Sequence, residues 1–247
     1  MTTSNDDVIW GIEQGEFHVE YMPIVSLATG ACVAAEALVR WKKDGKTISP
    51  AVFIPEIEGT PAIGVLTYWL VEQVALELGA WLRAHRDFHL SLNVPPELFG
   101  RGGLQYAAHH AGVKDLYPQF VLELTERGSP DHISLEGLRS ARRLGLGIAI
   151  DDVESGNLNL LLLARTKLDY IKIDKSVVDQ ILSDGMIEET KEEIRRVAAA
   201  GRPVIVAEGI EHEVQARTLR ELGVRLGQGW FFSKSLSVDE FLAFVPR

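Results

Sequence analysis

Cysteine is almost absent from the sequence. The only cysteine is Cys32, so an internal disulfide bond and every metal site built from several cysteines are excluded. A chain without disulfides fits a reducing compartment best. The chemistry of this protein must therefore come from other side chains.

Long hydrophobic runs are also lacking. The longest, LNLLLLA at 158–164, is far shorter than the ~20 residues that a membrane-spanning helix needs. The first ten residues, MTTSNDDVIW, carry acidic side chains where a secretory signal peptide carries basic ones. These features predict a cytoplasmic protein with no membrane partner.

Positive charge is scarce. The chain has 25 Lys and Arg against 35 Asp and Glu, which gives a net charge of −10. This charge opposes a broad electrostatic hold on DNA, RNA or an anionic membrane. A small anionic ligand remains compatible with it if metal ions mediate the binding.

Short apolar runs alternate with longer stretches of helical period along the chain. Its 247 residues, 46% of them hydrophobic, are enough for a sizeable core. We expect one domain over residues 1–247, with a short N-terminal tail at about residues 1–7. The apolar runs lie at 17–27, 31–39, 88–94, 120–124, 147–151, 170–174, 203–209 and 225–232. Eight such runs, most of them separated by a helix, predict an α/β barrel.

Hydrophobic residues recur at three- and four-residue steps in the segments between these runs. In 65–82 the apolar face is formed by Val65, Leu66, Trp69, Leu70, Val74, Leu78 and Trp81. Further helices are expected at 135–144, 187–200 and 212–222. The aromatic residues at 230–232 are interpreted as barrel core rather than as a platform for stacking a base.

Polar side chains stand at the C-terminal ends of the apolar runs. They are Glu36, Asn93, Glu123, Asp151, Lys172, Glu208 and Gln228. In a parallel barrel these ends converge on one rim, where active sites are built. Several carboxylates on one rim repel one another unless cations lie among them. Oxygen ligands without cysteine or paired histidine suit Mg²⁺ or Mn²⁺.

The adjacent pair Asp151 and Asp152 can reach two metal ions at once. Two such ions can hold a water and stabilise the entering and leaving oxygens of a phosphoryl transfer. Lys172, the only lysine at these strand ends, could orient that water or neutralise developing charge.

These residues lie in an ordered set of motifs that resembles the EAL domain family of cyclic di-GMP phosphodiesterases. The motifs are YMPIVSLATGACVAAEALVRW, SLNVPPELF, LELTER, IAIDD, DYIKIDKSVV, VAEGIE and LGQGWFFSKSL. The resemblance covers nearly the whole chain. It implies a TIM-like (β/α)₈ barrel with one antiparallel strand, an active site on the C-terminal rim and two Mg²⁺ or Mn²⁺ ions.

The resemblance also implies roles for individual residues. One metal would be held by Glu36, Asn93, Glu123 and Asp151, and the second by Asp151, Asp152 and Glu208. Lys172, Glu208 and Glu211 would be catalytic, and Lys172 would contact the water nucleophile. Arg40, Gln228 and Asp174 would bind substrate, and Glu126 would anchor the loop after the aspartate pair. Two alternatives stay open: a surface salt bridge for Arg40, and a carboxylate favoured by a helix N-terminus for Glu126.

The sequence departs from the family pattern at two places. Met22 stands where a glutamine near the substrate is usual, and the loop after the aspartate pair reads DDVESG instead of a DDFGTG type. In this loop Val153 replaces an aromatic residue and Glu154 replaces a glycine, which removes the freedom to adopt positive φ. The changes put catalysis and a possible homodimer in doubt.

Three functions are therefore weighed. The first is hydrolysis of cyclic di-GMP to linear pGpG. The second is a weak or inactive EAL domain that serves as a cyclic di-GMP receptor or a protein-interaction module. The third is metal-assisted proton abstraction from a carboxylate substrate with Lys172 as the base, which rests on fold analogy alone.

Overall fold

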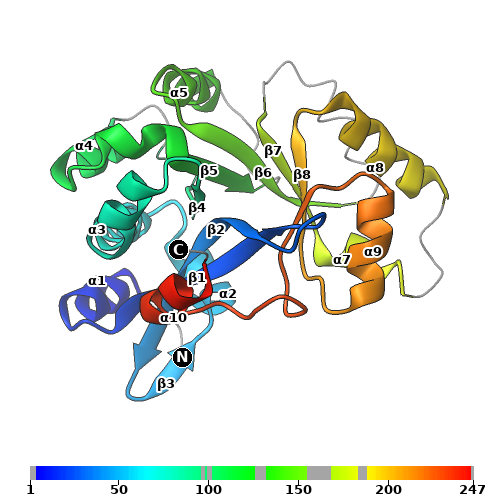
Figure 1. The fold of residues 1–247 in the computed structure, drawn as a ribbon. Helices are drawn as coiled ribbons and strands as arrows, with labels where there is room; N and C mark the ends of the chain where they lie inside the picture. The colour runs from blue at the N-terminus through cyan, green and yellow to red at the C-terminus, as the bar shows by residue number, and fades with distance from the viewer. Residues whose placement is uncertain are drawn as a thin grey trace.

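Eight strands close into a barrel (Figure 1). The computed structural model describes residues 4–95, 98, 102–125, 132–154, 168–182 and 188–245. The barrel strands are β1 (Phe17–Ser26), β2 (Cys32–Lys43), β4 (His89–Asn93), β5 (Phe120–Thr125), β6 (Gly147–Val153), β7 (Tyr170–Ile173), β8 (Val204–Ala207) and β9 (Leu226–Gly227). Their order is β1-β9-β8-β7-β6-β5-β4-β2, and pairing of β1 with β2 closes the ring. Each strand coincides with a predicted apolar run, so the predicted barrel is confirmed.

One strand of the barrel runs against the others. Strand β1 is antiparallel to both β2 and β9, whereas every other neighbouring pair in the ring is parallel. The link between β1 and β2 is too short for the crossover that parallel strands require. The C-terminal ends of the seven parallel strands therefore lie on one rim, hereafter the site rim.

Strand β2 continues past its predicted end at Val39 and forms a hairpin with β3 (Lys46–Ile48). The turn consists of Asp44 and Gly45, both with positive φ, 50° and 74°. Asp-Gly is a preferred pair for a two-residue hairpin turn, because both positions of the type I′ turn require positive φ. This signal was present in the sequence, but the hairpin was not predicted.

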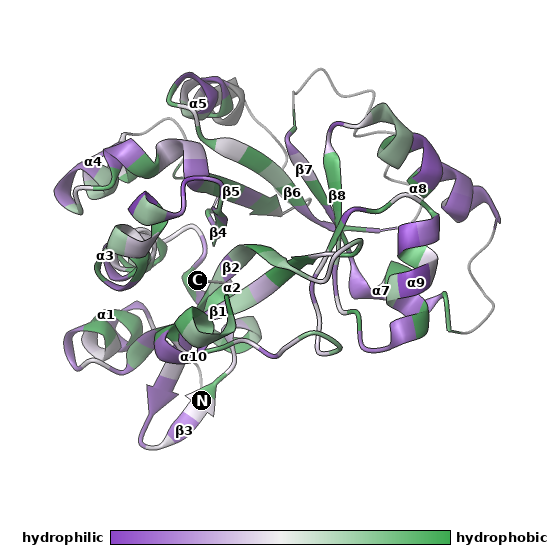
Figure 2. Ribbon diagram, in the orientation of Figure 1, coloured by the Kyte–Doolittle hydropathy of each residue, from purple (hydrophilic) through white to green (hydrophobic). Residues whose placement is uncertain are grey.

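Helices surround the strands (Figure 1). They are α1 (Asn5–Glu13), α2 (Pro50–Ile57), α3 (Pro61–Ala84), α4 (Gly103–His110), the 3₁₀ helix η2 (Lys114–Gln119), α5 (His132–Arg143), α7 (Lys175–Asp179), α8 (Glu188–Ala200), α9 (Glu213–Glu221) and α10 (Val238–Phe244). Helix α1 begins inside the expected tail because Ser4 and Asp7 form a capping box. Figure 2 shows hydrophobic residues along β5, β6 and β8 and hydrophilic residues on α8 and α9.

Helix α3 packs one face on the barrel. Leu66, Leu70, Val74 and Leu78 are buried as predicted, but Val65 lies on the exposed side. Among the described helices, α3 alone is long and apolar enough to cross a membrane by length and composition. More than half of its apolar window, 56%, is buried in the protein, which is the usual situation of a core helix.

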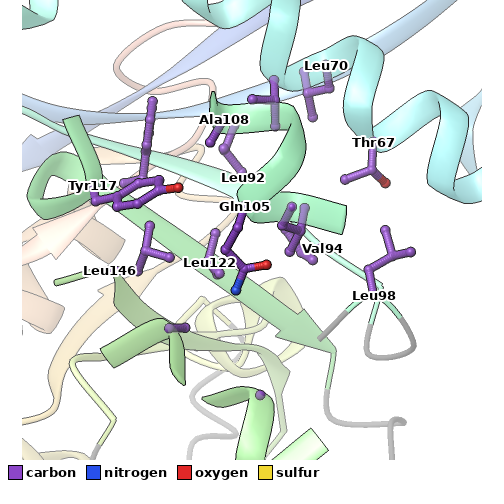
Figure 3. Close-up of a pocket in the computed structure, with 15 residues that line it drawn as sticks. Thr67, Leu70, Leu92, Val94, Leu98, Gln105, Ala108, Tyr117, Leu122 and Leu146 are labelled. Carbon is purple, nitrogen blue, oxygen red and sulfur yellow. The ribbon is translucent and has the colours of Figure 1, made fainter. Parts of the chain in front are cut away.

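A small cavity lies between α3, α4, η2 and strands β4 and β5 (Figure 3). Its volume is about 40 Å³, and most of its walls are aliphatic, as with Leu70, Leu92 and Leu122. A water molecule needs several polar partners to occupy such a space. We interpret this cavity as a packing gap outside the site rim.

Candidate metal centre and active site

The seven polar residues predicted at strand ends lie on the site rim. Asn93 is the last residue of β4 and is paired with Glu123 of β5. Glu208 and Gln228 directly follow β8 and β9. The remaining three, Glu36, Asp151 and Lys172, lie within β2, β6 and β7. Tertiary structure thus brings together side chains from seven different strands.

Lys172 lies at the centre of this group. Its side chain is 2% exposed, and its Nζ contacts four carboxylates. The distances are 3.0 Å to Glu36 Oε2, 2.8 Å to Glu123 Oε2, 3.1 Å to Asp151 Oδ1 and 2.8 Å to Glu208 Oε1. An ammonium group has only three N–H donors, so it cannot give each carboxylate its own hydrogen bond.

These contacts keep Lys172 protonated. Burial by itself lowers the pKa of the Lys172 amine, but the charges of the four carboxylates outweigh burial and hold it well above its usual value. A general base needs a pKa near the working pH. This arrangement makes Lys172 a hydrogen-bond donor and a positive charge, and it opposes the third function, in which Lys172 was the base.

The carboxylates of the group differ in their pKa. Burial raises the pKa of Glu123 well above its usual value, and the charge of Glu36 raises it further. Burial raises the pKa of Glu208 to about 8 and also raises that of Asp151, in each case against the attraction of Lys172.

Glu36 is the exception. Burial would raise the pKa of Glu36, but Lys172 and hydrogen bonds from the amides of Gln228 and Asn93 bring it below its usual value. These donors lie 2.9 Å from Glu36 Oε2 and 2.8 Å from Glu36 Oε1. The single ammonium group of Lys172 therefore does not neutralise all the carboxylates on the rim. The remaining carboxylates need protons or cations to stay buried together.

The carboxylates form two overlapping groups that could hold cations. One group is Glu36, Glu123 and Asp151, and the other is Asp151, Asp152 and Glu208. Within each group one oxygen per residue lies within 4.8 Å of the others. The ligand atoms are all carboxylate oxygens, which suit hard divalent cations. The donor set therefore fits divalent cations, and Asp151 is shared by both groups. The pair of metals and the predicted role of Asn93 as a further ligand stay predictions.

Asp152 adopts a left-handed backbone conformation, with φ 58°. Its backbone N–H donates to Asp151 Oδ1 at 3.0 Å. Its own side chain is exposed, whereas Asp151 and Val153 are buried. The strained turn therefore presents two successive carboxylates to the rim. Of the altered loop, Glu154 is exposed and Val153 packs in the core.

Gln228 joins the two groups. Its Nε2 donates to Glu36 Oε2 at 2.9 Å and to Glu208 Oε1 at 2.8 Å. Its Oε1 is buried and finds no donor among the described residues. A buried acceptor without a partner is unfavourable unless a water or a ligand donates to it. The predicted role of Gln228 in binding substrate stays a prediction.

Gly229 holds Gln228 in place. With φ 152° it passes so close to Ile210 that an added Cβ would lie 2.2 Å from the Ile210 N and O atoms. We expect Gly229→Ala to lower the free energy of unfolding by more than ~2 kcal/mol, since backbone must move. Gly30→Ala is the control, because Gly30 also has positive φ but open space around it. Denaturant unfolding that shows equal losses for both variants would contradict this role.

Arg40 lies on the wall of a cavity beside the acidic residues that could hold metal ions. The cavity, about 370 Å³, is lined by Arg40, Asn93, Glu123 and apolar residues of α2 and α3 such as Ile54 and Ile63. The Arg40 Nε donates to Glu20 Oε2 at 2.8 Å. A salt bridge, the alternative left open for Arg40, is thus present, and it fixes the guanidinium at the cavity wall.

Two of the predicted site residues lie apart from Lys172 and its carboxylate partners, and a third falls outside the described residues. Glu211 pairs with Lys175 at 3.2 Å and is exposed. Asp174 caps α7, where it accepts from Ser176 N at 2.8 Å. Glu126 falls outside the described residues. The predicted roles of these three residues stay predictions.

The interpretation of residues 230–232 as barrel core was wrong for Trp230 and Phe231, whereas Phe232 is half-buried and packs against the core. Trp230 is 66% exposed and Phe231 is 42% exposed. They follow Gln228 on the site rim because β9 ends at Gly227. Apolar sequence suggested a buried strand here, but the strand has only two residues and the chain then turns outward. These aromatic rings are available to a ligand.

The EAL domain family model matches residues 6–235. The chain belongs to the EAL domain family. This confirms the resemblance that the sequence motifs indicated. Among relatives, PdeB of Escherichia coli strain K12, named a probable cyclic di-GMP phosphodiesterase, is 37% identical over 240 residues, which cover 96% of this chain and 46% of PdeB.

Solved structures agree with the family assignment. The EAL enzyme Bd1971, with cAMP and cyclic di-GMP bound, has a TM-score of 0.84 at 29% identity, covering 98% of this chain and 68% of that one. The PaMucR phosphodiesterase in complex with c-di-GMP has a TM-score of 0.82 at 26% identity, covering 96% and 98%. This chain spans less than half the length of the curated relatives PdeB and PdeD, 46% and 44%.

Proposed function

We propose that this EAL domain hydrolyses cyclic di-GMP to linear pGpG with two Mg²⁺ or Mn²⁺ ions at the site rim. The proposal rests on two sets of three acidic residues beside Lys172 that have Asp151 in common. The sets are Glu36, Glu123 and Asp151, and Asp151, Asp152 and Glu208. The names of PdeB and of the PaMucR complex support the substrate. Bound cations would supply an activated water and stabilise the entering and leaving oxygens of the phosphodiester.

The residues of the rim divide the remaining work. Lys172, held as an ammonium, can neutralise negative charge that develops near the scissile phosphate. Arg40 can bind a phosphate oxygen from the cavity wall, since guanidinium matches phosphate geometry. The apolar walls of the same cavity and the exposed Trp230 offer surface to a guanine base.

The proposal is tested by incubating the purified protein with cyclic di-GMP and Mn²⁺ or Mg²⁺ and resolving the nucleotides by chromatography. We expect pGpG from the wild type and from Glu136→Ala, an exposed position on α5. No product is expected from Glu36→Ala or after chelation of the metal. Wild-type rates in Glu36→Ala would sink the assignment to this site.

A receptor without catalysis is the second candidate, and the position of Met22 favours it. Met22 lies directly opposite Glu36 in the β1–β2 pairing, so the glutamine usual in the family is missing beside a proposed metal ligand. A binding titration on the same sample separates the candidates. Tight binding without pGpG over hours would support the receptor, and neither binding nor product would leave a protein-interaction module.

A network that includes Glu20 and Ser235 positions Arg40. Ser235 Oγ donates to Glu20 Oε2 at 2.6 Å, and Arg40 donates to Ser235 Oγ at 3.2 Å. We expect Glu20→Gln to raise KM for cyclic di-GMP by about tenfold with a smaller change in kcat, because a charge-assisted hydrogen bond to Arg40 is weakened. Ser235→Ala should act in the same direction. Steady-state kinetics of both variants, with Glu136→Gln as control, measure this, and unchanged KM in both would contradict it.

A further inference from the structure

A polar cavity lies at the opposite rim of the barrel. Its volume is about 250 Å³. His89, Gly147, Tyr170 and Val204, the first residues of β4, β6, β7 and β8, line it. The N-terminal ends of parallel strands meet here, so the barrel core separates this cavity from the site rim. None of the proposed catalytic residues lines it.

Two guanidinium groups share one carboxylate at this cavity. Arg142 Nη1 lies 3.2 Å from Asp169 Oδ2, and Arg202 Nη1 lies 3.8 Å from Asp169 Oδ1. All three residues line the cavity. The charged residues that line the cavity are two arginines and one aspartate, although the whole chain carries −10.

The Asp169 carboxylate already accepts other hydrogen bonds and makes only a long contact with Arg202. Its Oδ2 accepts from Ile148 N at 3.1 Å and from Arg142. The 3.8 Å contact of Arg202 is too long for a hydrogen bond, and Arg202 makes none within the part of the chain that the structure describes. Its side chain is 80% exposed. The N–H donors of Arg202 are therefore available to a ligand.

The other walls leave room and add polar groups. Gly145 and Gly147 contribute no side chains to the wall, and Gly145 with φ 89° holds a backbone conformation that favours glycine. Tyr170 and His89 face each other edge-on, with ring centroids 6.4 Å apart. A tetrahedral oxyanion could accept hydrogen bonds here from guanidinium and phenol groups in different directions.

We propose that this cavity binds a phosphate group, either as the free ion or on a nucleoside monophosphate. Its volume lies near the lower end of the range for organic ligands, roughly 300 Å³, so it has room for a phosphate ion or for the phosphate end of a nucleoside monophosphate. Guanidinium groups match phosphate geometry with paired hydrogen bonds. This phosphate site does not depend on the proposed function, because none of its residues belongs to the acidic sets that could hold metal ions.

The test is a titration of the ¹⁵N-labelled full chain with inorganic phosphate in the presence of a chelator. Amide chemical shifts in NMR spectra monitor the binding. We expect saturable shifts at Gly145, Gly147 and Tyr170 in the wild type. Arg202→Gln should weaken binding about fivefold to tenfold, the loss expected for one charge-assisted contact. Arg195→Gln, which removes an exposed arginine of α8 paired with Glu188, should bind as the wild type does.

A parallel titration with GMP distinguishes the two sources of the phosphate group. Tighter binding of GMP than of phosphate would assign the cavity to a nucleoside monophosphate, and equal binding would assign it to the free ion. Absence of saturable shifts at these amides with either probe would overturn the proposal. Equal affinities in the wild type and Arg202→Gln would overturn it as well.

Discussion

Asp151→Asn is expected to abolish turnover of cyclic di-GMP. Asp151 belongs to both sets of acidic residues that could hold a metal ion, and its carboxylate also contacts Lys172 Nζ at 3.1 Å. Its loss therefore weakens both proposed metal sites at once. Because removal of a single transition-state donor commonly costs about 10²–10³ in kcat, we expect the rate to fall by more than about 10³-fold. Product formation measured over time at saturating Mn²⁺ gives this ratio.

The control for this variant is Asp239→Asn, which removes an exposed carboxylate from the first turn of α10 and should keep the wild-type rate. Thermal unfolding of Asp151→Asn in the presence of a chelator is expected to stay close to that of the wild type, since an amide has nearly the shape of a carboxylate and Lys172 keeps its other three carboxylate partners. A folded Asp151→Asn variant with more than a tenth of the wild-type rate would mean that the two groups are not both needed.

The strands and the rim could be predicted because their signals are local. Each strand is a short apolar run, and each polar residue at its end stands out against that run, as with Asp151 after GIAI. The reversed strand β1 came with the family resemblance, and the short link to β2 explains it. The Asp44–Gly45 hairpin and helix α1 were missed although their turn and capping residues are visible in the sequence.

Other features depend on distances that no local pattern contains. The predicted contact of Lys172 with the water nucleophile stays a prediction, but the closed ring brings Lys172 within 3.1 Å of four carboxylates, which the sequence could not show. Glu211 follows the same strand as Glu208, yet it turns to Lys175. Trp230 looked like core because it is apolar, but exposure is set by where β9 ends. The cytoplasmic location and the possible homodimer stay predictions.

Lys172→Met is expected to have the largest effect on stability. Methionine fills a similar buried volume without charge, so Glu36, Glu123, Asp151 and Glu208 lose their common cation. Removing one partner of a buried ion pair typically lowers the free energy of unfolding by about 3–5 kcal/mol. Denaturant unfolding in the presence of a chelator measures this loss. Turnover should also fall, because the positive charge near the scissile phosphate is gone.

Divalent cations decide whether this loss has the proposed cause. If repulsion among the carboxylates destabilises Lys172→Met, then Mn²⁺ should raise its unfolding midpoint more than that of the wild type, since a ligand that binds the folded state stabilises it. Lys175→Met is the matched control: Lys175 is half-exposed, pairs with Asp179 and Glu211, and should change stability by less than ~1 kcal/mol with no extra response to Mn²⁺. Equal Mn²⁺ responses in the three proteins would show that Lys172 does not share its carboxylates with metal, and the two-metal proposal would lose its structural basis.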